Sequence, residues 1–187
     1  MSSVDQSKSF IPLNIAVLTI SDTRALADDK SGTTLVDRLT AAGHRLAARD
    51  IVTDDVEAIR AVVKRWIDEP GVDVIITTGG TGFTGRDVTP EALEPLFEKR
   101  MDGFATLFLM ISHAKIGTSA IQTRATAGVA NSTYIFCLPG SPGACKDAWD
   151  EILVHQLDYR YRPCNFVEIM PRLDEDLRRA KAKGATV

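Results

Sequence analysis

Hydrophobic positions along the chain follow two alternating patterns. Short, nearly continuous apolar runs are typical of strands covered on both faces. We expect such strands over residues 13–20, 72–78 and 133–138, and a weaker strand over residues 45–52. Between them, apolar residues recur at helical spacing, as over residues 55–69, where Ile59, Val63 and Trp66 share one face. The alternation predicts an α/β fold, a three-layer α/β/α sandwich with a largely parallel sheet.

Glycine, proline and hydroxyl residues mark where the predicted helices begin and end. Gly43 follows one helical pattern as a stop signal. Thr89 precedes Pro90, which predicts a helix with Thr89 as N-cap and proline in its first turn. Ser141 and Pro142 repeat this arrangement. The order of elements is therefore three strands alternating with helices, two helices, a strand and a last helix.

The same patterns predict one domain with short ends. Residues 12–172 are expected to form the domain, residues 1–11 a flexible leader and residues 173–187 a charged flexible tail. Within the domain we expect a buried helix over residues 104–113. Residues 115–131 are rich in Thr, Ala and Gly, and they indicate a short strand or a hairpin.

Composition narrows the classes of partner and compartment. With 44% apolar residues, 25% charged residues and a net charge of −3, nothing calls for a nucleic acid or a membrane as partner. The 3 cysteines form no CxxC, and the 3 histidines are scattered, so no zinc site is indicated. No secretory signal pattern and no apolar run of membrane-spanning length is evident. We therefore expect a cytoplasmic protein.

Polar and glycine-rich segments follow the predicted strands at their carboxyl ends. The residues concerned are Ser21 and Asp22, then Asp54 and Asp55, then Gly79, Gly80, Thr81 and Gly82, and finally Pro139, Gly140 and Ser141. In an open parallel sheet these ends meet at one edge, which is where ligands bind. This convergence, more than any single motif, predicts a binding site.

The glycine loop is the most informative of these segments. Gly80, Gly82 and Gly85 match the spacing of a dinucleotide fingerprint, but the next helix is marked only a few residues later, which argues against that interpretation. Arg86 and Asp87 follow where a phosphate-binding P-loop would have lysine and a hydroxyl residue. The alternatives are a plain strand-to-helix turn and a loop whose N–H groups approach a phosphate, and the glycine density favours the second.

Acidic and basic side chains lie beside this loop. Asp87 stands just before a predicted helix, where it either binds Mg²⁺ next to phosphates or interacts with the helix dipole. Of Asp54 and Asp55, one is expected to cap the following helix and the other to face the cleft. Arg124, next to Thr123, is either a bidentate phosphate ligand or an ordinary surface residue.

The run TTGGTGFTGRDVTPEAL, residues 77–93, resembles the signature of the MoaB/MogA family of molybdenum cofactor biosynthesis proteins, which includes the G domain of gephyrin. The resemblance extends through SDT and DKSG near the first strand to LPGSPGACKDAWDEIL at residues 138–153, and it covers about residues 12–172. The segments GTSAIQTRATAGVAN and RPCNF are most similar to the MoaB branch.

The resemblance implies a fold like the molybdopterin-binding domain and an enzyme that adenylylates molybdopterin with Mg-ATP, releasing pyrophosphate. It also implies trimers, or hexamers built from trimers. Asp55 and Asp87 would be the catalytic acids and Mg²⁺ ligands, with Asp54 one register away. The nucleotide would contact Gly79, Gly80, Thr81, Gly82, Ser21 and Asp22. Molybdopterin would contact Thr123, Arg124, Pro139, Gly140 and Ser141.

Other functions stay open at this point. A protein of the same fold could hold molybdopterin without turnover, or its oligomer could dock other molybdenum cofactor synthesis proteins. An NAD-dependent dehydrogenase is the outside alternative.

Overall fold

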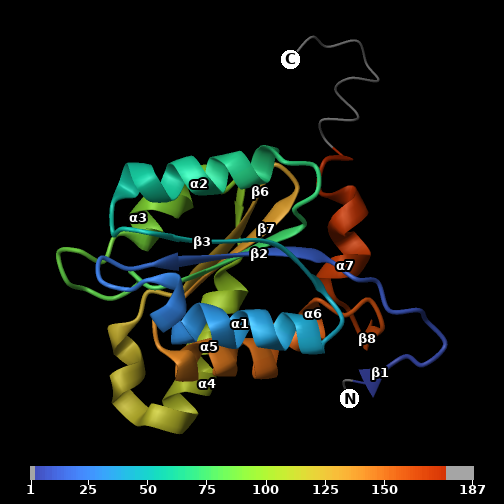
Figure 1. Cartoon of the computed structure of the whole chain (residues 1–187). Coiled ribbons are helices and arrows are strands. Elements are labelled where there is room, and N and C mark those ends of the chain that lie inside the picture. The colour runs from blue at the N-terminus through green and yellow to red at the C-terminus, as the bar shows by residue number, and fades with distance from the viewer. Residues whose placement is uncertain (1–2, 176–187) are drawn as a thin grey trace.

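The structure, a computed structural model, describes residues 3–175 (Figure 1). Within this part of the chain, a sheet of 6 strands has the order β3-β2-β4-β7-β6-β5. Its strands are β2 (Asn14–Ile20), β3 (Arg45–Val52), β4 (Val74–Thr78), β5 (Lys99–Arg100), β6 (Thr126–Ala130) and β7 (Thr133–Leu138). The helices are α1 (Lys30–Ala41), α2 (Val56–Asp68), α3 (Thr89–Leu93), α4 (Asp102–Ile116), α5 (Pro142–Ala148), α6 (Val154–Gln156) and α7 (Phe166–Ile169). Shorter 3-10 turns and one π-helical turn, Trp149–Leu153, complete the structure.

The predicted α/β sandwich is confirmed. Helices α2 and α3 cover one face of the sheet, and α1, α4 and α5 cover the other (Figure 1). One buried cluster lies on each face: Ile15 and Val17 of β2 point into the first, and Ala16 and Leu18 point into the second. This alternation follows from the two-residue period of a strand, and burial on both faces explains the continuous apolar runs.

The sheet is mixed, although most of it is parallel. Strand β2 pairs in parallel with β3 and β4, and β4 pairs in parallel with β7. Strand β6 runs antiparallel between β7 and β5. It joins β7 through Asn131 and Ser132, whose φ angles of 45° and 64° are those that a two-residue hairpin turn requires. The short strand expected within residues 115–131 is therefore confirmed as β6, and its hairpin partner, β7, lies just beyond that region.

Side-chain caps begin the helices that follow the strands. Asp55 caps α2 by accepting from Ala58 N, and Ser141 caps α5 by accepting from Ala144 N. The expectation for Thr89 is wrong, because Val88 occupies the cap position and makes no side-chain cap. The Thr89 hydroxyl instead donates to the Gly79 carbonyl at 2.8 Å, so it fixes the glycine loop.

Helix α4 is longer and more exposed than the expected buried helix. Phe104 and Phe108 pack into the core, but Leu107, Leu109 and Met110 are exposed. Within the described residues, the helical segment Asp102–Gln122 is long and apolar enough to cross a membrane, by length and composition only. The sequence patterns predict no apolar segment of that length. One such helix is weak evidence for a membrane, because helices of soluble proteins pass the same test.

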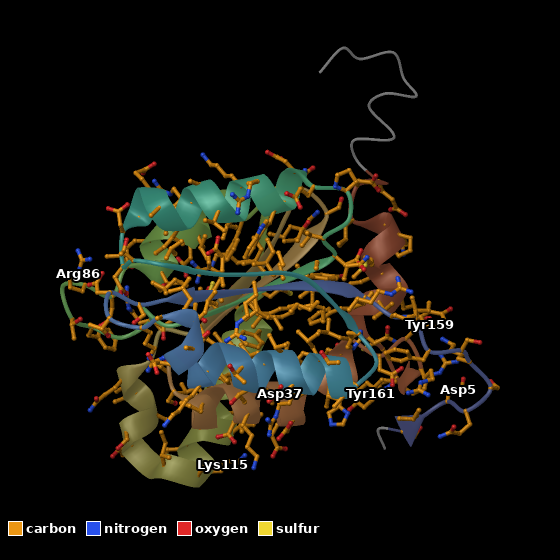
Figure 2. The ribbon with its side chains drawn as sticks, viewed as in Figure 1. Asp5, Asp37, Arg86, Lys115, Tyr159 and Tyr161 are labelled. Carbon is orange, nitrogen blue, oxygen red and sulfur yellow. The ribbon has the colours of Figure 1, made fainter. Side chains whose placement is uncertain are left out.

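The first residues pack against the end of the domain, where a flexible leader was expected. Strand β1 (Ser3–Val4) pairs antiparallel with β8 (Tyr161–Arg162), and Arg162 forms an ion pair with Asp5 at 2.9 Å. Asp5 and Tyr161 lie at one end of the molecule, far from Arg86 at the tip of the glycine loop (Figure 2). Of the expected charged tail, residues 176–187 lie outside the described part of the chain.

Candidate functional site

A cavity of about 540 Å³ opens at the carboxyl ends of the parallel strands. Its wall includes Ile20 at the end of β2, the loop after β4 and the segment after β7. Most of the predicted site residues line it: Ser21, Gly79, Gly80, Thr81, Gly82, Asp87, Thr123, Pro139, Gly140 and Ser141. The structure thus brings together segments that are far apart in sequence, as the strand order requires.

The backbone of the glycine loop approaches strand β2 too closely for side chains. Gly79 has a φ of 110°, and a Cβ there would overlap the Ile20 carbonyl oxygen. Gly80 has a φ of 63°, and a Cβ there would overlap the Thr89 hydroxyl. The Gly79 N–H donates to the Leu138 carbonyl at 3.0 Å. Glycine is required at both positions, so the loop forms a smooth floor of backbone in the cavity.

The two neighbouring acids after β3 take different positions. Asp55 lies outside the cavity wall, and its carboxylate accepts from Ala58 N at 2.8 Å as the cap of α2. Asp54 lines the cavity. Burial and the negative charge of Asp22 raise the pKa of Asp54. The acid that faces the cleft is therefore Asp54, whereas Asp55 is the cap of α2.

Asp87 lines the same cavity from the far end of the glycine loop. Its Oδ2 accepts from Thr84 N at 2.8 Å and from Thr84 Oγ1 at 2.6 Å. Burial opposes ionisation of Asp87, but these hydrogen bonds outweigh it and lower the pKa of the carboxyl. Asp87 is therefore ionised at neutral pH.

These two carboxylates fit the way proteins hold Mg²⁺ beside a nucleotide. In the described residues, His, Cys, Asp and Glu form no group of three or more that could hold a metal by itself. Mg²⁺ is usually bound by one or two carboxylates together with substrate phosphates and waters. Asp54 and Asp87 match that donor set, whereas a metal bound without phosphates would lack ligands.

Arg124 supports the loop and is not part of the cavity wall. Its Nε donates to the Gly82 carbonyl at 2.8 Å, and its Nη2 donates to the Asp87 carbonyl at 2.9 Å. Its Nη1 pairs with Glu91, whose pKa this contact lowers. The guanidinium that was expected to bind a ligand phosphate is thus engaged along both edges.

Asp22 also lies outside the cavity wall, and it contacts Arg86 and Asp54. It forms a bidentate ion pair with Arg86, with both N–O distances at 2.8 Å, and the hydrogen bonds from Arg86 lower the pKa of Asp22. It also accepts from Asp54 N at 3.1 Å. Asp22 therefore joins the loops that carry Asp54 and Arg86.

Sequence reasoning did not select two residues of the cavity wall, Arg24 and Gln122. Arg24 donates from Nη1 to Ser31 Oγ at 2.9 Å and to the Gly140 carbonyl at 3.1 Å. The available signal was its place directly after the first strand, beside Ser21. Gln122 carried no signal, because it lies in an irregular segment.

Comparisons with known proteins agree with this fold. Residues 16–159 match the family model described as a probable molybdopterin binding domain. Molybdenum cofactor biosynthesis protein B of Escherichia coli K12 is 51% identical over 160 residues, covering 86% of this chain and 94% of that protein. The protein of the same name from Bacillus subtilis is 42% identical over 164 residues, covering 86% and 96%.

Solved structures that are similar to this chain include further cofactor biosynthesis proteins of this kind. A crystal structure of molybdenum cofactor biosynthesis protein B has a TM-score of 0.78 and 40% identity, covering 80% of this chain and 94% of that one. The tungsten cofactor synthesizing protein MoaB from Pyrococcus furiosus has a TM-score of 0.70 and 34% identity, covering 76% and 91%. The chain therefore belongs to the molybdopterin-binding-domain family of molybdenum cofactor biosynthesis proteins, as its resemblance to MoaB and MogA predicts.

Proposed function

We propose that this chain is a cytoplasmic enzyme that adenylylates molybdopterin, with Mg-ATP as the adenylyl donor. The similar proteins support a role in molybdenum cofactor biosynthesis. The observation that carries the finer proposal is the meeting of Asp54 and Asp87 beside the glycine loop in one cavity. A site that only held the pterin would have no need for two carboxylates beside a glycine loop.

The proposed reaction is a transfer between phosphates. An oxygen of the molybdopterin phosphate forms a bond to the α-phosphorus of ATP, and the bond from that phosphorus to the leaving pyrophosphate breaks. The backbone of residues 79–82 would hold the nucleotide phosphates. Asp54 and Asp87 would hold Mg²⁺, which supplies neutralisation of the charge on the transferring and leaving groups. Thr123, Pro139 and Gly140 would contact the pterin.

The experiment compares adjacent acids. Purified protein is incubated with molybdopterin, ATP and Mg²⁺, and adenylylated pterin is quantified by mass spectrometry. Asp54→Asn and Asp87→Asn should each lower the rate about 10²–10³-fold, because each removes a charge that faces the phosphates. Asp55→Asn is the matched control and should keep the rate, because asparagine also caps a helix.

One result would contradict the enzyme, and another would contradict the roles assigned to its two acids. Pterin binding without any product from the wild type would make the chain a binding protein. A loss of rate in Asp55→Asn equal to that in Asp54→Asn would show that the carboxylates act through the fold and not through the phosphates.

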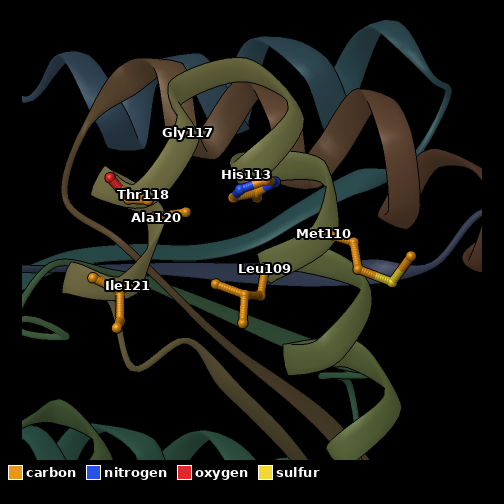
Figure 3. A pocket seen from close by; sticks show the side chains of 7 residues that line it. All are labelled: Leu109, Met110, His113, Gly117, Thr118, Ala120 and Ile121. Carbon is orange, nitrogen blue, oxygen red and sulfur yellow. The ribbon is translucent and has the colours of Figure 1, made fainter.

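A non-catalytic assembly role is the second candidate, and the exposed face of α4 favours it. A mainly apolar cavity of about 410 Å³ lies between α4 and the 3-10 turn Gly117–Gln122 (Figure 3). Met110 and Ile121 line it and are 65% and 75% exposed. A surface of this kind suits self-association into trimers or hexamers, and an oligomer could dock other molybdenum cofactor synthesis proteins.

A further inference from the structure

The charged side chains of the cavity lie beside different loops. Asp54 lies near Gly80, and Asp87 lies near Gly82. Arg24 lies beside Gly140, in the segment that follows β7. Among the described residues that line the cavity, Arg24 is the one cation. The wall therefore offers carboxylates along the glycine loop and a guanidinium at the segment after β7.

The guanidinium of Arg24 is held by one nitrogen only. Nη1 makes both of its hydrogen bonds, to Ser31 Oγ at 2.9 Å and to the Gly140 carbonyl at 3.1 Å. Ser31 is buried and donates to Asp29, so this anchor is part of the core. The Nε and Nη2 donors have no partner in the described part of the chain, and they form the edge that binds phosphate or carboxylate bidentately.

Arg124 differs from Arg24 in the hydrogen bonds of its guanidinium. Each nitrogen of its guanidinium contacts the protein, through Gly82, Asp87 and Glu91. A ligand could reach that guanidinium only by breaking the contacts that shape the glycine loop. Of the two arginines, Arg24 is therefore the one that has an edge available to a ligand.

We propose that Arg24 binds the phosphate of the acceptor, a pterin monophosphate, at the segment after β7. This inference rests on the proposed function. The acceptor phosphate is a dianion that the carboxylates of Asp54 and Asp87 would repel, so it needs a cation of its own. Arg24 supplies that cation and holds the phosphate oxygen that attacks the donor. Arg24 thus binds the acceptor, and the glycine loop binds the nucleotide.

The test is a binding experiment without ATP, so that no turnover occurs. The probes are molybdopterin and the same pterin after enzymatic removal of its phosphate, both titrated anaerobically. Arg24→Gln should weaken binding of the phosphorylated pterin about 10- to 100-fold and leave the dephosphorylated pterin unchanged. Glutamine keeps an N–H donor for the Gly140 carbonyl. Arg24→Lys, which keeps the charge but not the two-pronged edge, should give an intermediate loss.

The control variant is Arg65→Gln, which removes the same charge from the surface of α2, where Arg65 pairs with Asp50 at 3.8 Å. It should leave both affinities unchanged. The proposal is overturned if Arg24→Gln binds the phosphorylated pterin as tightly as the wild type, or if it loses affinity for both pterins equally. A wild type that makes no adenylylated product would reject the enzyme, but a phosphate-dependent loss in Arg24→Gln would still place the acceptor phosphate at Arg24.

Discussion

His44 is a polar residue placed in the apolar interior. Its Nδ1 accepts from Leu13 N at 3.2 Å, but its Nε2 is buried without a hydrogen-bond partner in the described residues. The ring packs against Phe10 and Trp149. Burial lowers the pKa of His44 from 6.5 to about 4, although Asp158 acts in the opposite direction. The folded protein therefore holds this imidazole neutral, whereas the unfolded chain takes up a proton near pH 6.5.

This difference predicts that the free energy of unfolding falls as the pH drops from 6.5 toward 4. Above pH 6.5 His44 is neutral in both the folded and the unfolded state, so it adds no pH dependence to the free energy of unfolding. At pH 5 it is protonated mainly in the unfolded chain, which stabilises that state by about 2 kcal/mol. Urea unfolding of the wild type and of His44→Gln at pH 7.5 and pH 5 measures the effect. The drop between the two pH values should be about 2 kcal/mol smaller in the variant, and an equal drop in both proteins would contradict the prediction.

Asp54 and Asp55 show how far single residues can be predicted. The sequence places both acids after a strand and before a helix, and it predicts that they divide between capping and facing the cleft. Which one turns inward depends on whether the helix begins one residue earlier or later, and sequence patterns do not resolve that step. Arg24 could not be separated from Asp22 as the residue that faces the cavity, because both lie in the irregular loop after β2.

At the scale of elements, the glycine loop after β4 offers a sharp test of its backbone. Gly79→Ala should lower the free energy of unfolding by roughly 1–3 kcal/mol, because alanine is strained at positive φ and its Cβ would meet the Ile20 carbonyl. Gly85→Ala is the matched control, since a Cβ there would meet nothing within 4 Å. Chemical denaturation of the two variants gives the comparison.

The two loop variants also distinguish an effect on the shape of the cavity from an effect on the stability of the fold. Because Gly79 lies in the cavity wall, its replacement should weaken ATP binding as well, measured by calorimetry at a temperature where both variants are folded. Equal stability of Gly79→Ala and Gly85→Ala would mean that the loop relaxes freely and is not held by β2.

Elements were predictable where one local signal decides them. The buried strands and the cap at Ser141 follow from short-range patterns. Thr89 is a residue type that often caps helices, but its hydroxyl donates to the Gly79 carbonyl on the other side of the loop. Local sequence patterns do not predict such a contact. Strand β6 lacked a strong pattern because most of its residues are small and they are buried within the sheet faces, with the Phe97 ring directly against Gly128.

At the scale of the whole molecule, the exposed apolar face of α4 predicts self-association. The double substitution Met110→Glu and Ile121→Glu should convert the proposed oligomer into monomers, because it places charges on the face that would be buried between copies. Light scattering after size-exclusion chromatography measures the mass. Ile169→Glu is the control, since Ile169 is 45% exposed on α7, away from this face, and its replacement should leave the mass unchanged.

A wild type that is monomeric at micromolar concentration would refute the trimer or hexamer. An oligomer that survives the double substitution would place the contact surface elsewhere on the molecule.

The cavity wall is drawn from segments that span residues 20 to 142, and this has a consequence for folding. No single strand, helix or loop contains the whole wall, so an occupant can bind only after β2, β4 and β7 have assembled. Occupancy is therefore linked to the native state as a whole, and at 100 times its dissociation constant a ligand adds about 2.7 kcal/mol of stability. Under the proposed function, cellular supply of pterin and nucleotide would then set how long the protein survives proteolysis, so a cell short of these ligands would also lose the protein.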